Sequence, residues 1–148
     1  MSPRRGLETA MAAREAALQM LYALDLGGGD AGPVAAAYRR DHPLAPAVAQ
    51  RAELLLHRAS SARQQIEDLI VRHSVGWRLE RMSAIDRNLL KLGTAEMLLG
   101  QPAATVVQAT LRLARKFSQP EAISFLQGLL EAIARELAAH SEVVQHVQ

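Results

Sequence analysis

Cysteine is absent from the sequence, and aromatic residues make up only 3% of it. The absence of cysteine excludes disulfides, cysteine-ligated zinc and cysteine nucleophiles. Few residues are β-branched, whereas alanine and leucine are abundant, a composition typical of helices. No apolar run approaches the roughly 20 residues needed to span a membrane. No apolar segment follows the N-terminal arginines either, so we expect a cytoplasmic protein without a signal peptide.

The common signatures of enzymes are also missing. The sequence contains no phosphate-binding P-loop, no G-x-G-x-x-G fingerprint, no H-E-x-x-H zinc motif and no G-x-S-x-G nucleophile elbow. The five histidines are scattered, without a second ligand at metal-binding spacing. We therefore expect a protein that is not an enzyme and that carries no metal or cofactor. The net charge is only +2, so any basic patch must come from local clustering of arginines.

The stretch from Ser83 to Leu130 predicts three consecutive helices. Ser83 and Asp86 form an S-x-x-D capping box at the start of the first helix. Gly100 ends that helix, and Pro120 suits the first position of the third. Apolar residues recur every three or four positions throughout, so these helices must bury one face against the rest of the chain.

Outside this stretch, the pattern predicts helices over about 7–26 and 34–40 and one long helix over 46–73. The apolar rhythm of the long helix fits a coiled-coil seam, but its small alanines favour close packing inside a bundle. Trp77 is expected to close one end of that bundle. With 148 residues, the whole chain (1–148) is expected to be a single all-α domain of six to seven helices, with residues 1–6 and 139–148 as mobile tails.

Three basic or polar features are candidates for nucleic-acid binding. Arg112, Arg115 and Lys116 share one helical face, although cations at a helix C-terminus also suit the macrodipole. A second feature is the arginines at 4, 5 and 14, which also fit a routine charged tail; the one at 14 is expected to be exposed. The third is the loop 118–124 with Phe125, since cations can hold RNA phosphates and aromatic rings can stack on bases. The Phe125 ring fits the core better.

Four patterns together resemble a known family. They are A-R-x-x-A-L-Q-x-L-Y (13–22), I-D-R-x-L-L-x-L (85–92), V-x-x-x-L-x-L-A-x-K-F (107–117) and F-x-x-G-x-L (125–130). Each pattern alone is weak, but all four occur in register over nearly the whole chain. In this respect the sequence is similar to the NusB family of bacterial transcription antitermination factors.

The resemblance implies an all-α protein of two stacked helical bundles that form one compact domain. It also implies a non-enzymatic factor that binds boxA-type single-stranded RNA of ribosomal operons together with the ribosomal small-subunit protein NusE and joins RNA polymerase in an antitermination complex. The implied RNA-binding residues are Arg4, Arg5, Arg14, Arg115, Lys116, Glu121, Ser124 and Phe125. The implied partner-binding residues are Tyr22 and Asp86.

One departure from the family pattern bears on function. The arginine run usual before the position of Arg14 is replaced by residues 8–12, which hold no arginine. Fewer cations lower the affinity for RNA and its dependence on salt. Two alternatives therefore stay open: a protein-interaction module that has lost selective RNA binding, and a free-standing relative of the N-terminal domain of ribosomal RNA cytosine methyltransferases. A homodimer through the long third helix is also possible.

Overall fold

The computed structural model describes residues 3–76 and 79–147, and every regular element within them is helical. The α-helices are α1 (Pro3–Gly27), α2 (Ala31–Asp41), α3 (Pro46–Ser61), α4 (Arg63–His73), α5 (Ala84–Leu98), α6 (Ala103–Phe117) and α7 (Ile123–Val147). Two short 3₁₀ turns are η1 (Leu79–Arg81) and η2 (Pro120–Ala122). The prediction of an all-α fold with six to seven helices is confirmed. Trp77 lies outside the described residues.

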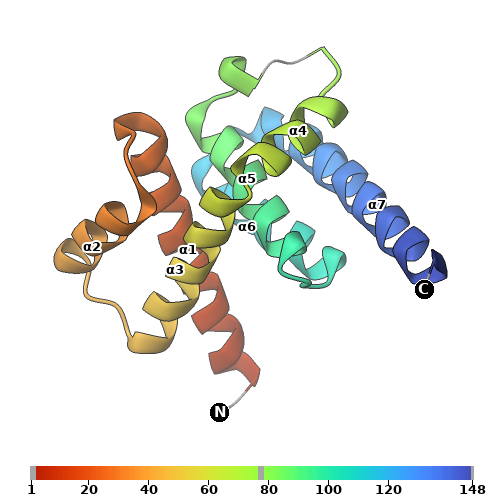
Figure 1. Ribbon diagram of the computed structural model, residues 1–148. Coiled ribbons are helices and arrows are strands. Elements are labelled where there is room, and N and C mark those ends of the chain that lie inside the picture. Colours follow the sequence, from red (N-terminus) through yellow and green to blue (C-terminus); the bar gives the residue numbers. More distant parts are fainter. Residues whose placement is uncertain (1–2, 77–78, 148) are drawn as a thin grey trace.

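The helices form two groups, and α5 of the second group contacts both. One group is α1, α2 and α3, which pack on one another, and the other is α4, α5, α6 and α7. Helix α5 also packs on α1 and α3, so it joins the two groups (Figure 1). Its residues from Asn88 to Met97 are buried apart from the half-buried Lys91. A helix that is buried almost all round belongs at the centre of a fold, as expected for the stretch that begins at Ser83.

Gly93 explains how closely the second group packs. A Cβ atom at this position would lie 3.0 Å from the Cδ2 atom of Leu130 on α7 and 3.0 Å from the Oγ1 atom of Thr110 on α6. These distances are shorter than ordinary contacts, so a glycine lets α6 and α7 approach α5 together. Thr110 satisfies its buried hydroxyl by donating to the carbonyl oxygen of Val106 at 2.8 Å.

The caps and ends of α5 to α7 fall near the residues that the sequence indicates. The Ser83 hydroxyl accepts a hydrogen bond from the backbone N–H of Asp86 at 3.1 Å and so caps α5. Gly100 follows the helix with a φ of 90°, a conformation that favours glycine. Pro120 opens the turn η2, and α7 begins three residues later, at Ile123. The predicted N-cap and glycine stop are therefore confirmed.

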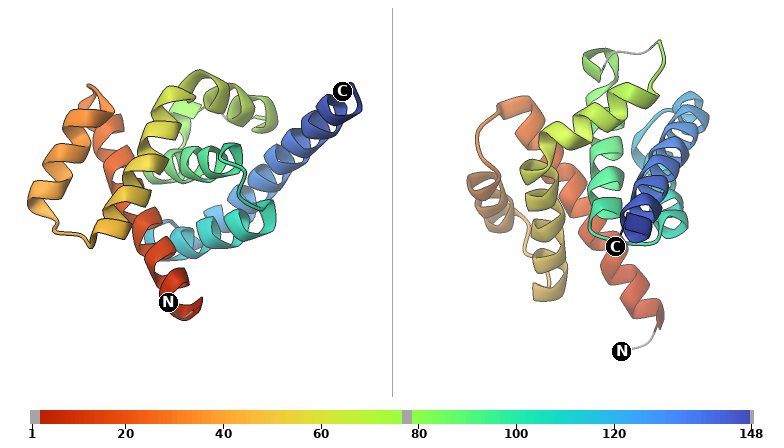
Figure 2. Two further views of the ribbon diagram at one scale, coloured as in Figure 1. Left: turned by 60° about the horizontal axis from the view of Figure 1, so that its bottom comes forward. Right: turned by 45° about the vertical axis from the view of Figure 1, so that its right-hand side comes forward.

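The single long helix expected over 46–73 is wrong, because Ala62 divides it into α3 and α4. Ala62 has φ −103° and ψ 20°, outside the helical range. The Ser61 hydroxyl just before it donates to the carbonyl oxygen of Arg58 at 3.3 Å, a bond that competes with the helical ladder and bends helices. The bend points α4 toward α7, as Figure 2 shows. The choice of bundle packing over a coiled coil agrees with the buried apolar residues of both helices.

Helix α4 is joined to α7 by charged side chains. Glu136 on α7 accepts hydrogen bonds from Arg72 at 2.6 Å and contacts the His73 ring nitrogen at 2.8 Å. The hydrogen bond from Arg72, followed by the contact with His73, lowers the pKa of Glu136 to about 2. The charged form of Glu136 is thus the form that holds α4 and α7 together.

The ends of the chain carry helix where tails are expected. Helix α1 begins at Pro3 and α7 continues to Val147. The mobility of residues 1–6 and 139–148 stays a prediction. Within the part of the chain that the structure describes, no helix combines the length and the apolar character needed to cross a membrane.

Candidate nucleic-acid interface

Helix α6 presents its cations outward, because its other faces are in the core. Val106, Val107, Leu111, Leu113 and Ala114 are buried, and their spacing places the polar residues on the opposite side. The exposed residues include Gln108, Arg112, Arg115 and Lys116. Among the described residues, no carboxylate lies within ion-pair distance of Arg112 or Arg115.

Lys116 is held differently from its neighbours. Its Nζ atom lies 2.9 Å from a carboxylate oxygen of Glu15 on α1 and 5.2 Å from the centre of the Phe117 ring. The ion pair joins the end of α6 to the middle of α1. Lys116 therefore contributes less free positive charge to the surface than the arginines do.

A groove of about 500 Å³ separates α6 from the first half of α1. Its walls are Leu7, Met11, Arg14, Ala104, Thr105, Gln108, Ala109 and Arg112. Arg4 lies one turn before Leu7 on the same side of α1, 90% exposed and 3.4 Å from Glu8. We call this the α1–α6 groove. Arginines stand at its helix α1 end and on its α6 wall, while its floor is apolar.

Arg14 is buried, so the expectation that its side chain is exposed is wrong. It is only 5% exposed, and Glu96 on α5 is 1% exposed. The guanidinium binds this carboxylate in two places, with Nε to Oε1 at 2.8 Å and Nη2 to Oε2 at 2.6 Å. Its Nη1 atom also contacts the sulfur of Met11 at 3.4 Å, and Arg51 on α3 approaches Glu96 to 3.7 Å. Arg14 thus fastens α1 to α5 rather than facing the groove with a free charge.

The sequence held one signal for this ion pair. Glu96 is the only charged residue between Leu92 and Leu99, and a carboxylate inside an apolar helix requires a cation beside it. The partner is 82 residues away in the chain, so its identity comes only from the fold.

The loop after α6 is on the surface, but its aromatic residue is turned to the core. Glu121 and Ser124 are exposed. Phe125 is half-buried and packs against the hydrophobic core, which confirms the interpretation of its ring as core. Its remaining exposed edge borders a shallow hollow shared with Ser124 and with His73 of α4. The structure therefore does not bring Phe125 into the α1–α6 groove.

Asp86 and Tyr22, the two expected partner-binding residues, are both half-buried. The Asp86 carboxylate accepts a hydrogen bond from the hydroxyl of Ser118, which joins the start of α5 to the end of α6. Tyr22 precedes Asp25 on α1 by one turn, and Asp25 forms an ion pair with Arg87 of α5. Burial raises the pKa of Asp25, but the hydrogen bond and charge of Arg87 outweigh it, so the pKa is lowered overall. Asp86 therefore lies beside the end of α6, and Tyr22 lies one turn from the pair of Asp25 and Arg87.

Within the described ranges 3–76 and 79–147, no group of three or more potential ligand side chains is placed to hold a metal ion. The α1–α6 groove presents guanidinium groups, an amide and a hydroxyl beside apolar side chains, and the two expected partner-binding residues are a phenol and a carboxylate. Such side chains bind by charge, hydrogen bonding and stacking.

Comparison with known proteins identifies relatives over most of the chain. The sequence model of the NusB family matches residues 11–135. The chain is 40% identical over 131 residues to the transcription antitermination protein NusB of Koribacter versatilis (strain Ellin345), covering 85% of this chain and 88% of that protein. It is 35% identical over 126 residues to the protein of the same name from Sorangium cellulosum (strain So ce56), covering 84% and 90%.

A solved structure also matches the fold. The chain superposes with a TM-score of 0.79 on a crystal structure of the antitermination factors NusB and NusE in complex with double-stranded RNA. The two sequences are 25% identical, and the match covers 87% of this chain and 98% of the other. The similarity therefore extends over nearly the whole of the two helix groups.

Proposed function

Because the chain belongs to the NusB family of transcription antitermination proteins, we propose that it binds boxA-type RNA along the α1–α6 groove. The observation that carries this proposal is the placement of exposed arginines at the start of α1 and along α6, on either side of an apolar floor. Cations bind the phosphates of a single strand, while an apolar floor suits the faces of its bases.

We assign the phosphate contacts to Arg4, Arg5 and Arg112, and to Arg115 where the strand leaves this groove, since Arg115 lies on the other side of α6. Lys116 belongs to the same surface with part of its charge neutralised by Glu15. Glu121, Ser124 and the exposed edge of Phe125 lie outside the α1–α6 groove, at the loop after α6, and are proposed as separate RNA contacts. Arg14 acts indirectly, since its ion pair with Glu96 sets the position of α1 on which the groove depends.

NusE is the proposed protein partner, at the surface that contains Tyr22 and Asp86. Asp86 contacts Ser118 at the end of α6, and the nearby Lys116 contacts Glu15 of α1. A partner that changes either contact would shift the end of α6, and this would couple its binding to that of RNA. The assembled complex would join RNA polymerase on ribosomal operons in the cytoplasm, with residues 1–148 acting as one domain.

The direct experiment replaces Arg4 and Arg5 with alanine and measures RNA binding over a range of salt concentrations. Removing one cation from the phosphates of a single strand lowers the slope of log affinity against log salt by about 0.7. The double variant should bind more weakly and with a smaller slope. Arg40→Ala is the matched control, because Arg40 is an exposed arginine of α2, which packs on α1 and α3. Equal slopes in all three proteins would contradict the assignment.

A second function is supported by one observation. Arg14 is engaged with Glu96, and residues 8–12 contain no arginine, so the N-terminal half of the groove has few free cations. The chain would then act as a protein-interaction module that binds NusE without selecting an RNA sequence. Equal affinity for boxA and scrambled RNA, with intact binding of NusE, would support this function.

A further inference from the structure

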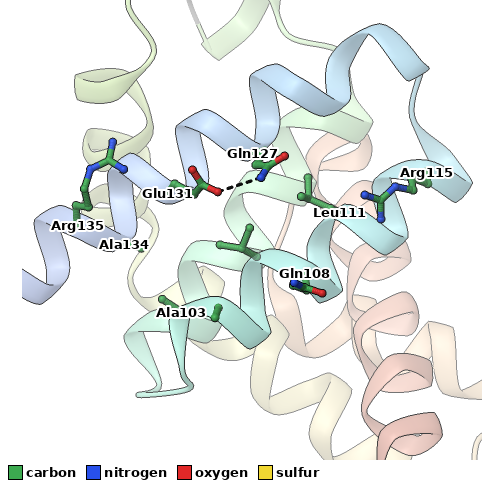
Figure 3. Close-up of a pocket in the computed structure, with 10 residues that line it drawn as sticks. Ala103, Gln108, Leu111, Arg115, Gln127, Glu131, Ala134 and Arg135 are labelled. Carbon is green, nitrogen blue, oxygen red and sulfur yellow. Dashed lines mark hydrogen bonds between the residues drawn. The ribbon is translucent and has the colours of Figure 1, made fainter.

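A second groove lies on the other side of α6, between α6 and α7, with a volume of about 490 Å³. Its walls are Ala103, Ala104, Val107, Gln108, Leu111, Arg115, Gln127, Glu131, Ala134 and Arg135. Figure 3 shows Arg115 and Arg135 at opposite ends, with Gln127 and Glu131 between them. We call this the α6–α7 groove. On α7 alone it extends from Gln127 to Arg135, a distance of about 12 Å for a helix.

The charge of the α6–α7 groove favours an anion. Arg115 and Arg135 are exposed, and no carboxylate of the described residues pairs with either. The one acidic residue of the groove, Glu131, accepts a hydrogen bond from the side-chain amide of Gln127 at 3.0 Å. Two guanidinium groups, neither of them paired with a carboxylate that the structure describes, therefore stand at the ends of a floor that includes the apolar side chains of Val107 and Leu111.

The two grooves adjoin at α6. Ala104 and Gln108 line both of them. Arg112 stands on the side of the α1–α6 groove, and Arg115 on the side of the α6–α7 groove. A strand that lies in the first groove can therefore cross the helix over the small side chain of Ala104 and the amide of Gln108.

We propose that the α6–α7 groove holds the RNA that flanks the boxA element, with Arg115 and Arg135 on its phosphates. The amides of Gln108 and Gln127 face the same groove and can hydrogen-bond exposed base edges. This inference rests on the proposed function, because it extends the same RNA path beyond the α1–α6 groove. Arg135 would then contribute to the affinity only for RNAs that extend beyond the boxA element.

The test compares Arg135→Ala with the unchanged protein on two RNAs, the boxA element alone and the same element extended at either end. The variant should bind the short RNA as the unchanged protein does. It should bind one extended RNA about three- to fivefold more weakly at physiological salt, with a salt slope lower by about 0.7. Arg135→Lys should restore the salt slope for the extended RNA, and Arg40→Ala should leave the affinity for both RNAs unchanged. Unchanged unfolding temperatures verify that each variant is folded.

The possible failures are distinguishable. If the unchanged protein binds boxA selectively but gains nothing from either extension, the α6–α7 groove does not hold RNA and the proposed function stands. If it binds boxA no better than a scrambled RNA, the proposed function and this inference both fail. If Arg135→Ala instead changes the mass of the protein in solution, the groove is an interface between protein copies and the inference is overturned.

Discussion

Replacing Arg14 with alanine should destabilise the protein strongly, because it leaves the carboxylate of Glu96 buried without its main partner. Glu96 is 1% exposed, and Arg14 provides its two shortest contacts, at 2.6 and 2.8 Å. Breaking a buried ion pair from one side costs about 3–5 kcal/mol. A domain of this size has a total stability of about 5–15 kcal/mol, so the loss is a large fraction of it.

Arg51 does not compensate for this loss. Its Nη2 atom is 3.7 Å from Glu96, and its side chain is 37% exposed, so its interaction with the carboxylate is weaker and screened by water. Urea unfolding followed by circular dichroism measures the change directly. The melting temperature should fall by about 10–15 °C, given a shift of roughly 3 °C for each kcal/mol in a chain of this length.

A double replacement, Arg14→Met with Glu96→Leu, tests whether Arg14 only positions α1 or also contacts RNA with its charge. Exchanging a buried ion pair for apolar residues of similar volume is often neutral or stabilising, so stability should return to within about 1 kcal/mol of the original. If Arg14 only positions α1, the double variant should bind RNA with an unchanged salt slope. A slope lower by about 0.7 would mean that Arg14 contacts a phosphate. A loss of stability below about 1 kcal/mol in Arg14→Ala would refute the argument.

Three further predictions concern packing, the partner surface and pH. Gly93→Ala should destabilise the protein by about 1–3 kcal/mol, because the new Cβ atom would crowd α6 and α7. Gly128 has open space around it, so Gly128→Ala should stabilise the protein by about 0.5–1 kcal/mol. Denaturant unfolding of the two variants measures both changes. Asp86→Ala should weaken binding of NusE more than binding of RNA when each is titrated separately. Unchanged affinity for NusE would contradict the assignment of Asp86 to partner binding. Ser118→Ala is the control, because it removes only the hydrogen bond between α5 and α6. The pKa of Glu136 is lowered from 4.5 to about 2 by folding, so its carboxylate stabilises the fold fully at pH values above 4.5 and loses this contribution as the pH falls toward about 2. Glu136→Gln should therefore flatten the plot of unfolding free energy against pH between about 2 and 4.5, as measured by urea unfolding at several pH values.

Local features of the fold were predictable from the sequence. The Ser83 cap, the glycine stop at Gly100 and the apolar stripe of α6 each depend on residues a few positions apart. Hydrogen bonding and helix periodicity act over the same short range, so the sequence contains the whole of the relevant information. The break at Ala62 was not predictable in this way, because the apolar rhythm continues through it.

The candidate site was predictable only in part, because its decisive contacts are remote in sequence. The exposed cations of α6 follow from spacing within one helix. By contrast, Arg14 and Glu96 are 82 residues apart, and Asp86 and Ser118 are 32 apart. The position of Arg14 in a basic N-terminal segment indicates a surface charge, whereas the packing of α1 on α5 buries it. Arg135 lines the α6–α7 groove because α7 packs on α6, and this contact was not predictable from the sequence around Arg135.

The central claim is that this member of the NusB family selects boxA-type RNA through charged residues of α1 and α6. The most direct test is the fluorescence anisotropy of a labelled boxA RNA titrated with the protein, alone and with NusE, beside a scrambled RNA. The account predicts tighter binding of boxA than of the scrambled RNA, loss of affinity as salt rises, and a further gain when NusE is present. Binding of NusE with equal affinity for both RNAs would contradict it.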